Sequence, residues 1–149
     1  MENSEHLVTV DFPGDIEYIP DIRRFLSNII SLRSFSRRFA FRMEIIVDEL
    51  CNNAIKFGNL RVGEFVTITC RVRDEEVVVD VSNPGSDEKE VRNLKKAVAA
   101  GAGEAEAPAD FVIGRGIQII KILSSSVQVL DNGGTMVRVT KKKIENEDL

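Results

Sequence analysis

The segment from Ile45 to Asn59, which reads IIVDELCNNAIKFGN, constrains the fold more than any other part of this sequence. Its apolar residues recur at helical spacing and form a stripe that one face of a helix would bury, namely Ile45, Ile46, Leu50, Ala54 and Phe57. Glu49 and Asn53 are four residues apart, so they share one helix face beside this stripe. They are either polar border residues of an amphipathic helix, or a site whose amide oxygen binds magnesium and whose carboxylate takes a proton.

The composition is that of an ordinary globular protein. The 149 residues are 43% hydrophobic and 30% charged, which predicts a single domain, 1–149, with a real core. No apolar run approaches membrane-spanning length and the start of the chain lacks a secretory signal, so we expect a cytoplasmic protein that does not bind membranes. The net charge of -4 argues against direct nucleic-acid binding. Cys51 and Cys70 lie in apolar-periodic segments and are predicted to be small buried thiols.

The remaining patterns alternate between strands and helices. Apolar alternation predicts a first strand, and helical spacing then predicts two helices, the second beginning after an Arg-rich turn at Arg33 to Arg38 and ending near Lys56 with Gly58 as its cap. Two hairpins are expected, one before and one after a further helix that starts at Ile117. The expected strands are His6–Phe12, Glu64–Val72, Val77–Ser82, Ser126–Leu130 and Thr135–Thr140. This order predicts an α+β two-layer sandwich, with a mixed, mostly antiparallel sheet and helices on one face.

Three features between the hairpins are compatible with nucleotide binding. Asn83 and Gly85 end a strand, where an amide and an open backbone suit a purine, although taken alone the segment is more simply a strand-ending turn. Residues 87–113 are predicted to be a mobile lid or a disordered insertion, because 99–110 are small and acidic. Gly114-Arg115-Gly116 opens the next helix, where backbone amides approach phosphate, unless the two glycines only form a turn. Residues 141–149 are expected to be a charged, frayed tail.

The order of these motifs resembles the GHKL ATPase superfamily. The matching motifs are Glu49-x-x-x-Asn53-Ala54, VSNPG at 81–85, the lid, GRGI at 114–117 and GGTMV at 133–137. Within that superfamily the chain is most similar to the anti-sigma factor serine/threonine kinases, because it is short and opens with VTVDFPGDIEYIPDIRRFLSNI. The resemblance extends from about His6 to Lys142.

The resemblance implies a role for each matching residue. Glu49 would be the catalytic carboxylate, Asn53 the magnesium ligand and Asn83 the adenine contact, where the superfamily usually has aspartate. Arg115 is the candidate cation for the transferred phosphoryl group. The other implied ATP-binding residues are Gly85, Gly114, Gly116, Ile117 and Thr135. Phe57 departs from the histidine common in the anti-sigma branch, and Asp87 departs from the second glycine expected after Gly85. The arginine commonly found just ahead of Gly114 is also absent, since Phe111-Val112-Ile113 stands there.

The resemblance also implies partners. It predicts an ATP- and Mg²⁺-dependent serine/threonine kinase that binds a sigma factor and phosphorylates an anti-anti-sigma antagonist on serine. The alternatives are a non-catalytic, nucleotide-gated partner switch and a stand-alone histidine-kinase ATPase domain. A homodimer built around the first strand is expected. A basic face of this chain is expected to bind an acidic partner, and it consists of Arg23, Arg24, Arg33, Arg37 and Arg38.

Overall fold

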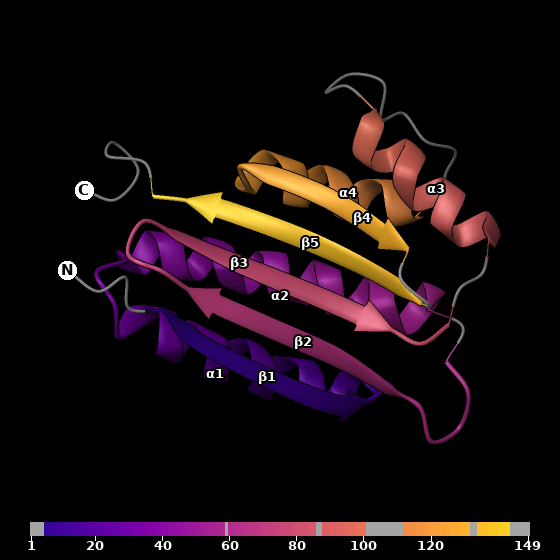
Figure 1. Cartoon of the computed structure of the whole chain (residues 1–149), viewed down its shortest axis with the longest axis horizontal. Helices are drawn as coiled ribbons and strands as arrows, with labels where there is room; N and C mark the ends of the chain where they lie inside the picture. Colours follow the sequence, from indigo (N-terminus) through magenta and orange to yellow (C-terminus); the bar gives the residue numbers. More distant parts are fainter. Residues whose placement is uncertain (1–4, 59, 86–87, 101–111, 132–133, 144–149) are drawn as a thin grey trace.

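The computed structural model describes residues 5–58, 60–85, 88–100, 112–131 and 134–143 as one sheet with helices packed against it (Figure 1). A short 3-10 helix, η1 (Ile16–Tyr18), precedes α1 (Ile19–Ser31), and the other helices are α2 (Arg37–Phe57), α3 (Glu88–Ala99) and α4 (Val112–Leu123). The strands are β1 (His6–Pro13), β2 (Phe65–Val72), β3 (Glu76–Asn83), β4 (Ser126–Asp131) and β5 (Thr135–Lys142).

The sheet has the strand order β1-β2-β3-β5-β4, and its four described pairings are all antiparallel. The α+β two-layer prediction is confirmed, and the sheet, which was expected to be mixed, contains no parallel pair among the described strands. Side chains alternate between faces, so that Val66, Ile68, Cys70 and Val72 of β2 are fully buried towards the helices. The intervening residues of β2 point away from the helices and are less buried.

The two long helices form where the apolar periodicity predicts them. Ser36 caps α2, because its hydroxyl accepts a hydrogen bond of 3.0 Å from the backbone amide of Phe39. The predicted turn at 33–38 therefore ends earlier than expected, and α2 starts at Arg37. Gly58 is the C-cap, with a right-handed φ of -80°. The buried face of α2 is Phe39, Ala40, Met43, Ile46, Val47, Leu50, Cys51 and Ala54.

The start of α4 differs from the prediction. The helix was expected from Ile117 onward, with the two glycines just ahead of it, but it begins at Val112, so that Gly114 and Gly116 both lie inside it. Glycine costs a helix only about 1 kcal/mol relative to alanine, which the packing of neighbouring apolar residues can offset. Within the predicted lid, residues 88–99 form α3, while 101–111 lie outside the described residues, as does the tail beyond Lys143.

A buried lysine fixes the direction of α4 relative to α2. Lys141 is 3% exposed, and its Nζ donates a hydrogen bond of 2.8 Å to the carbonyl oxygen of Leu123, the last residue of α4. The same Nζ lies 5.2 Å from the centre of the Phe39 ring, near the start of α2. Because Gly116 lies beside Glu49 and Asn53 further along α2, the two helices run antiparallel.

Two hydrogen bonds attach α3 to α4. Gln118 donates to the carbonyl oxygen of Ala97 at 3.1 Å, and the Lys121 ammonium donates to the carbonyl oxygen of Ala100. Ala97 lies in the last turn of α3 and Ala100 directly follows the helix, where carbonyl groups lack a partner within the helix. The pair α3 and α4 therefore packs as one unit beside α2 and β4.

The prediction for the two cysteines is confirmed. Cys51 and Cys70 are both free and fully buried, and burial raises the pKa of each thiol to about 12. Neither therefore carries reactive thiolate at neutral pH. No described helix combines the length and the apolar composition needed to cross a membrane.

Candidate functional site

Glu49 and Asn53 lie on α2 directly beneath Gly116 of α4. A Cβ atom built on Gly116 would lie 2.7 Å from Oε2 of Glu49 and 3.3 Å from Nδ2 of Asn53. The first distance is shorter than van der Waals contact allows, so only glycine fits here without displacing the carboxylate. The structure thus brings the two polar residues of α2 and one glycine of the GRG motif to one place.

The environment of Glu49 favours its neutral form. Its pKa is raised above the ordinary value, first by burial and then by the like charge of Asp48, while Lys56 partly offsets both. Asp48 itself is held by Arg23 of α1, with 2.7 Å between Nη1 and Oδ2. A carboxylate that is partly desolvated in this way is a stronger base than one in water, which suits proton abstraction from a hydroxyl group.

Asn83, Gly85 and Thr135 form a second group at the ends of β3 and β5. Asn83 and Thr135 are opposite each other in the β3–β5 register, and both are less than 10% exposed, at 8% and 7%. The hydroxyl of Thr135 donates to the carbonyl oxygen of Gly85 at 3.2 Å. Oδ1 of Asn83 is buried and has no hydrogen-bond partner within the described part of the chain.

A small cavity joins the two groups. It has a volume of about 20 Å³, and Asn53, Asn83 and Thr135 all line it. Nδ2 of Asn53 is also buried without a partner among the described residues. An unpaired buried polar atom typically costs about 1–3 kcal/mol, and two residues that line this cavity, Asn53 and Asn83, each carry one. A polar ligand in this cavity would supply hydrogen-bond partners for these two atoms.

Helix α3 closes this cavity. Glu90, Val91 and Leu94 line it from α3, and the remaining volume holds about one water molecule. Ligand sites for molecules of nucleotide size typically have volumes of about 300 Å³ or more. A nucleotide base can enter only if the side chains of α3 move away from α2 and β3. These three residues were not predicted to belong to the site, although the apolar spacing of Val91, Leu94 and Ala97 indicates an amphipathic helix.

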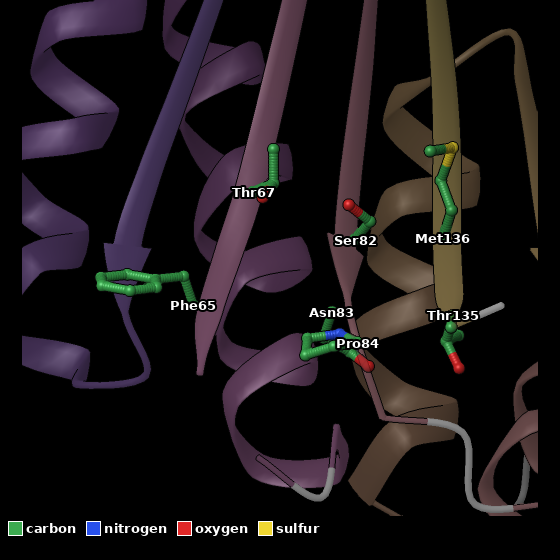
Figure 2. A pocket seen from close by; sticks show the side chains of 8 residues that line it. Phe65, Thr67, Ser82, Asn83, Pro84, Thr135 and Met136 are labelled. Atoms are coloured by element: carbon green, nitrogen blue, oxygen red, sulfur yellow. The ribbon is translucent and has the colours of Figure 1, made fainter. Parts of the chain in front are cut away.

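A larger cleft lies on the other face of the sheet, away from the helices (Figure 2). Its volume is about 300 Å³, and none of the described residues that line it is charged. Phe65, Ser82, Pro84 and Met136 surround it, and their strand neighbours Val66, Val81 and Val137 are buried on the helix side. The cleft shares the ends of β3 and β5 with the cavity, but it contains neither Glu49 nor Asn53.

The other residues expected in the site have different positions. Arg115 is exposed in the first turns of α4, next to Gly116, and forms no hydrogen bond or ion pair with the described site residues. Ile117 is fully buried and packs in the core. Gly114 lies inside the helix rather than ahead of it. Ile117 therefore acts on the site only indirectly, because its packing in the core holds α4, and with it Gly116, in place.

No group of three or more His, Cys, Asp or Glu side chains in the described residues could hold a metal ion. A cation at Asn53 would therefore take one amide oxygen from the protein and its remaining oxygens from a ligand and water, as magnesium usually does beside phosphates.

The sequence matches the family described as histidine kinase-like ATPase domain over residues 12–141. The chain belongs to this family, which is part of the GHKL superfamily. The match contains both groups of site residues and the two elements, α3 and α4, that cover them. No curated protein matches the chain significantly. Membership of an ATPase family implies that this domain binds ATP.

Proposed function

We propose that this protein is an ATP-dependent serine/threonine kinase that acts as an anti-sigma factor and phosphorylates an anti-anti-sigma antagonist on serine. The observation that carries the proposal is the position of Glu49, a partly desolvated carboxylate beside Asn53 and beneath Gly116. The motif order and the similarity of the first strand and helix to the anti-sigma kinases support the choice of substrate class.

In the proposed reaction, the carboxylate of Glu49 accepts the proton of the substrate serine hydroxyl. The serine oxygen forms a bond to the γ-phosphorus as the bond to the β–γ bridging oxygen breaks, and ADP leaves. MgATP supplies the phosphoryl group and a charge-neutralising cation when bound. Asn53 would hold the magnesium through its amide oxygen, and Arg115 would balance charge on the transferred group.

The adenine end of the site would be formed by β3 and β5. Oδ1 of Asn83, unpaired in the described structure, would accept a hydrogen bond from the adenine amino group. Thr135 supports this strand end by its hydrogen bond to the Gly85 carbonyl oxygen. Entry of the base requires α3 to move, because Val91 and Leu94 occupy the space beside Asn83.

The closed cavity also favours a second candidate function. If α3 moves only when nucleotide binds, ATP alone would change the surface that partners meet, and a non-catalytic switch could work in this way. The two functions share the same site and differ only in whether a phosphoryl group passes from ATP to the partner, with Glu49 accepting the proton of the substrate hydroxyl.

Mixing the purified protein with a candidate antagonist and γ-labelled ATP tests the proposal. Acid-stable phosphoserine on the antagonist supports the kinase. Acid-labile phosphohistidine would instead identify a stand-alone histidine-kinase ATPase domain. ATP-dependent exchange of partners without any labelled product would identify the switch.

Replacing Asn83 with leucine tests the adenine contact. The adenine amino group would lose its acceptor in a mostly dry site, so ATP binding should weaken by roughly 1–3 kcal/mol. GTP, which has no amino group at the corresponding ring position, should lose less. Titration of both nucleotides into Asn83→Leu gives the comparison, and Ser82→Ala is the control, because Ser82 lies on the other face of β3. An equal loss for ATP and GTP would show that Asn83 does not read the base.

We also propose that the protein is a C₂ homodimer built around β1. In the described sheet β1 pairs only with β2, so the outer edge of β1 presents backbone groups to a second chain. Light scattering at micromolar concentration should report about twice the chain mass of 16.6 kDa. A monomer with and without MgATP would contradict this prediction.

A further inference from the structure

Helix α4 exposes two isoleucines on the side that faces solvent. Ile122 is 77% exposed and Ile119 is 38% exposed, although both belong to a helix whose other face is buried in the core. Arg115, Ile119 and Ile122 follow the spacing of one helical stripe. Neither isoleucine belongs to the core cluster of the described residues or packs against it, and Ile122 in particular lies mostly in solvent.

This stripe leads directly to the candidate active site. Arg115 precedes Gly116, which lies over Glu49 and Asn53. The other end of α4 is fixed near Phe39 through Lys141, so α2 runs antiparallel beside it. The first turns of α2 add exposed Arg38 and Phe41 to the same helical layer, and Phe41 is 61% exposed.

The charge of this surface is positive although the chain carries a net charge of -4. Helix α4 has no acidic residue, and α2 has none before Glu44. Basic side chains beside exposed apolar ones complement a partner that presents acidic residues around apolar anchors.

The arginine face expected from the sequence is smaller than predicted. Arg23 is paired with Asp48 at 2.7 Å, and Arg33 is paired with Asp74 at 2.7 Å, so neither is available to a partner without breaking an ion pair. Arg24, Arg37 and Arg38 remain exposed. The available positive charge therefore lies partly in the first turn of α2, and the start of α2 is near the end of α4 because Lys141 contacts both Phe39 and Leu123.

We propose that Arg115, Ile119 and Ile122 of α4, with Arg38 and Phe41 of α2, form a docking surface for an acidic, apolar segment of the protein that the kinase phosphorylates. The inference rests on the proposed function for the identity of that partner. A segment that covers Ile119 and Ile122 and pairs with Arg115 brings the adjoining part of its protein to the end of α4 that meets Glu49. The surface thus determines which serine reaches the carboxylate.

Ile122→Glu tests this surface, with Leu32→Glu as the matched control. Leu32 is 78% exposed, as exposed as Ile122, and lies at the end of α1 away from α4. The probe is a fluorescently labelled amphipathic peptide with leucines at helical spacing and aspartates between them. Fluorescence anisotropy should show binding that weakens with added salt, and Ile122→Glu should weaken it roughly tenfold or more. Leu32→Glu should bind like the parent, and thermal unfolding should show that both variants fold.

Several outcomes would overturn the inference. The first is that the parent does not bind the peptide, and the second is that Ile122→Glu and Leu32→Glu lose equal affinity for it. The third is that Ile122→Glu loses self-association but still binds the peptide. Binding of vesicles containing phosphatidylglycerol in place of the peptide would identify a membrane surface instead. The assay needs neither ATP nor transfer, so its result is separate from the kinase test. Peptide binding that depends on Ile122 without phosphoserine formation would leave the surface standing and reject the kinase.

Discussion

Replacing Glu49 with glutamine is expected to lower the rate of phosphoryl transfer by roughly 10²- to 10⁴-fold. Glutamine keeps the shape of the side chain beneath Gly116 but cannot accept a proton from a substrate hydroxyl, which is the role proposed for Glu49. Nucleotide binding should stay close to the parental value, because the proposed contacts to the base and the metal come from Asn83 and Asn53. Single-turnover transfer of label to the antagonist, together with nucleotide titration, separates these two effects.

Asn53→Ala is the comparison for this experiment. It removes the amide oxygen proposed to bind magnesium, so magnesium-dependent affinity for ATP should fall along with transfer. The two variants should therefore differ in binding while both fail in chemistry. Transfer by Glu49→Gln at the parental rate would show that another group takes the proton.

The substitution Glu49→Gln should also stabilise the folded protein at neutral pH. The pKa of Glu49 is raised in the fold, first by burial, so the folded protein binds this proton more tightly than the unfolded chain does. As pH rises from the ordinary pKa of a glutamate to the raised pKa, the free energy of unfolding of the parent falls. The Glu49→Gln variant has no ionisable group at this position, so it does not lose this stability. The unfolding temperature of Glu49→Gln should therefore exceed that of the parent at pH 7, and the difference should shrink as pH falls toward about 4 and disappear below it.

Local periodicity was enough to predict most of the fold and half of the site. Apolar spacing in 45–57 identified α2 and placed Glu49 and Asn53 on one face, because helix geometry fixes which residues are neighbours. Alternation identified the strands, and the β3–β5 register then brought Asn83 opposite Thr135. Each of these relations is set by residues close in sequence or by a regular ladder.

The relations between distant helices could not be predicted in the same way. No local pattern states that Gly116 lies over Glu49, or that Val91 and Leu94 close the cavity beside Asn83, since both depend on how α3 and α4 pack against α2. The start of α4 was misplaced because glycine was interpreted as a helix boundary, whereas here Gly116 is needed inside the helix for close approach.

This close approach yields the second large effect. Gly116→Ala should strongly reduce phosphoryl transfer although it is a favourable substitution for a helix. The new Cβ would lie 2.7 Å from Oε2 of Glu49, so the flexible carboxylate, rather than the helix backbone, must move. A displacement of about 1 Å in a reacting group can cost about 10²-fold in rate. Alanine meanwhile favours the helix by about 1 kcal/mol, so the free energy of unfolding should stay the same or rise.

A double-mutant cycle shows whether Gly116 acts through Glu49. In the Glu49→Gln background, Gly116→Ala should add little to the loss of transfer, because the group that it displaces no longer takes the proton. Independent, additive losses would mean that the glycine serves another purpose, such as backbone contact with phosphate. Loss of thermal stability in Gly116→Ala alone would show that the helix, and not the carboxylate, gives way. Suppose that transfer falls, stability is unchanged and the two losses are not additive. The role of Gly116 is then to leave space for the Glu49 carboxylate in its reactive position.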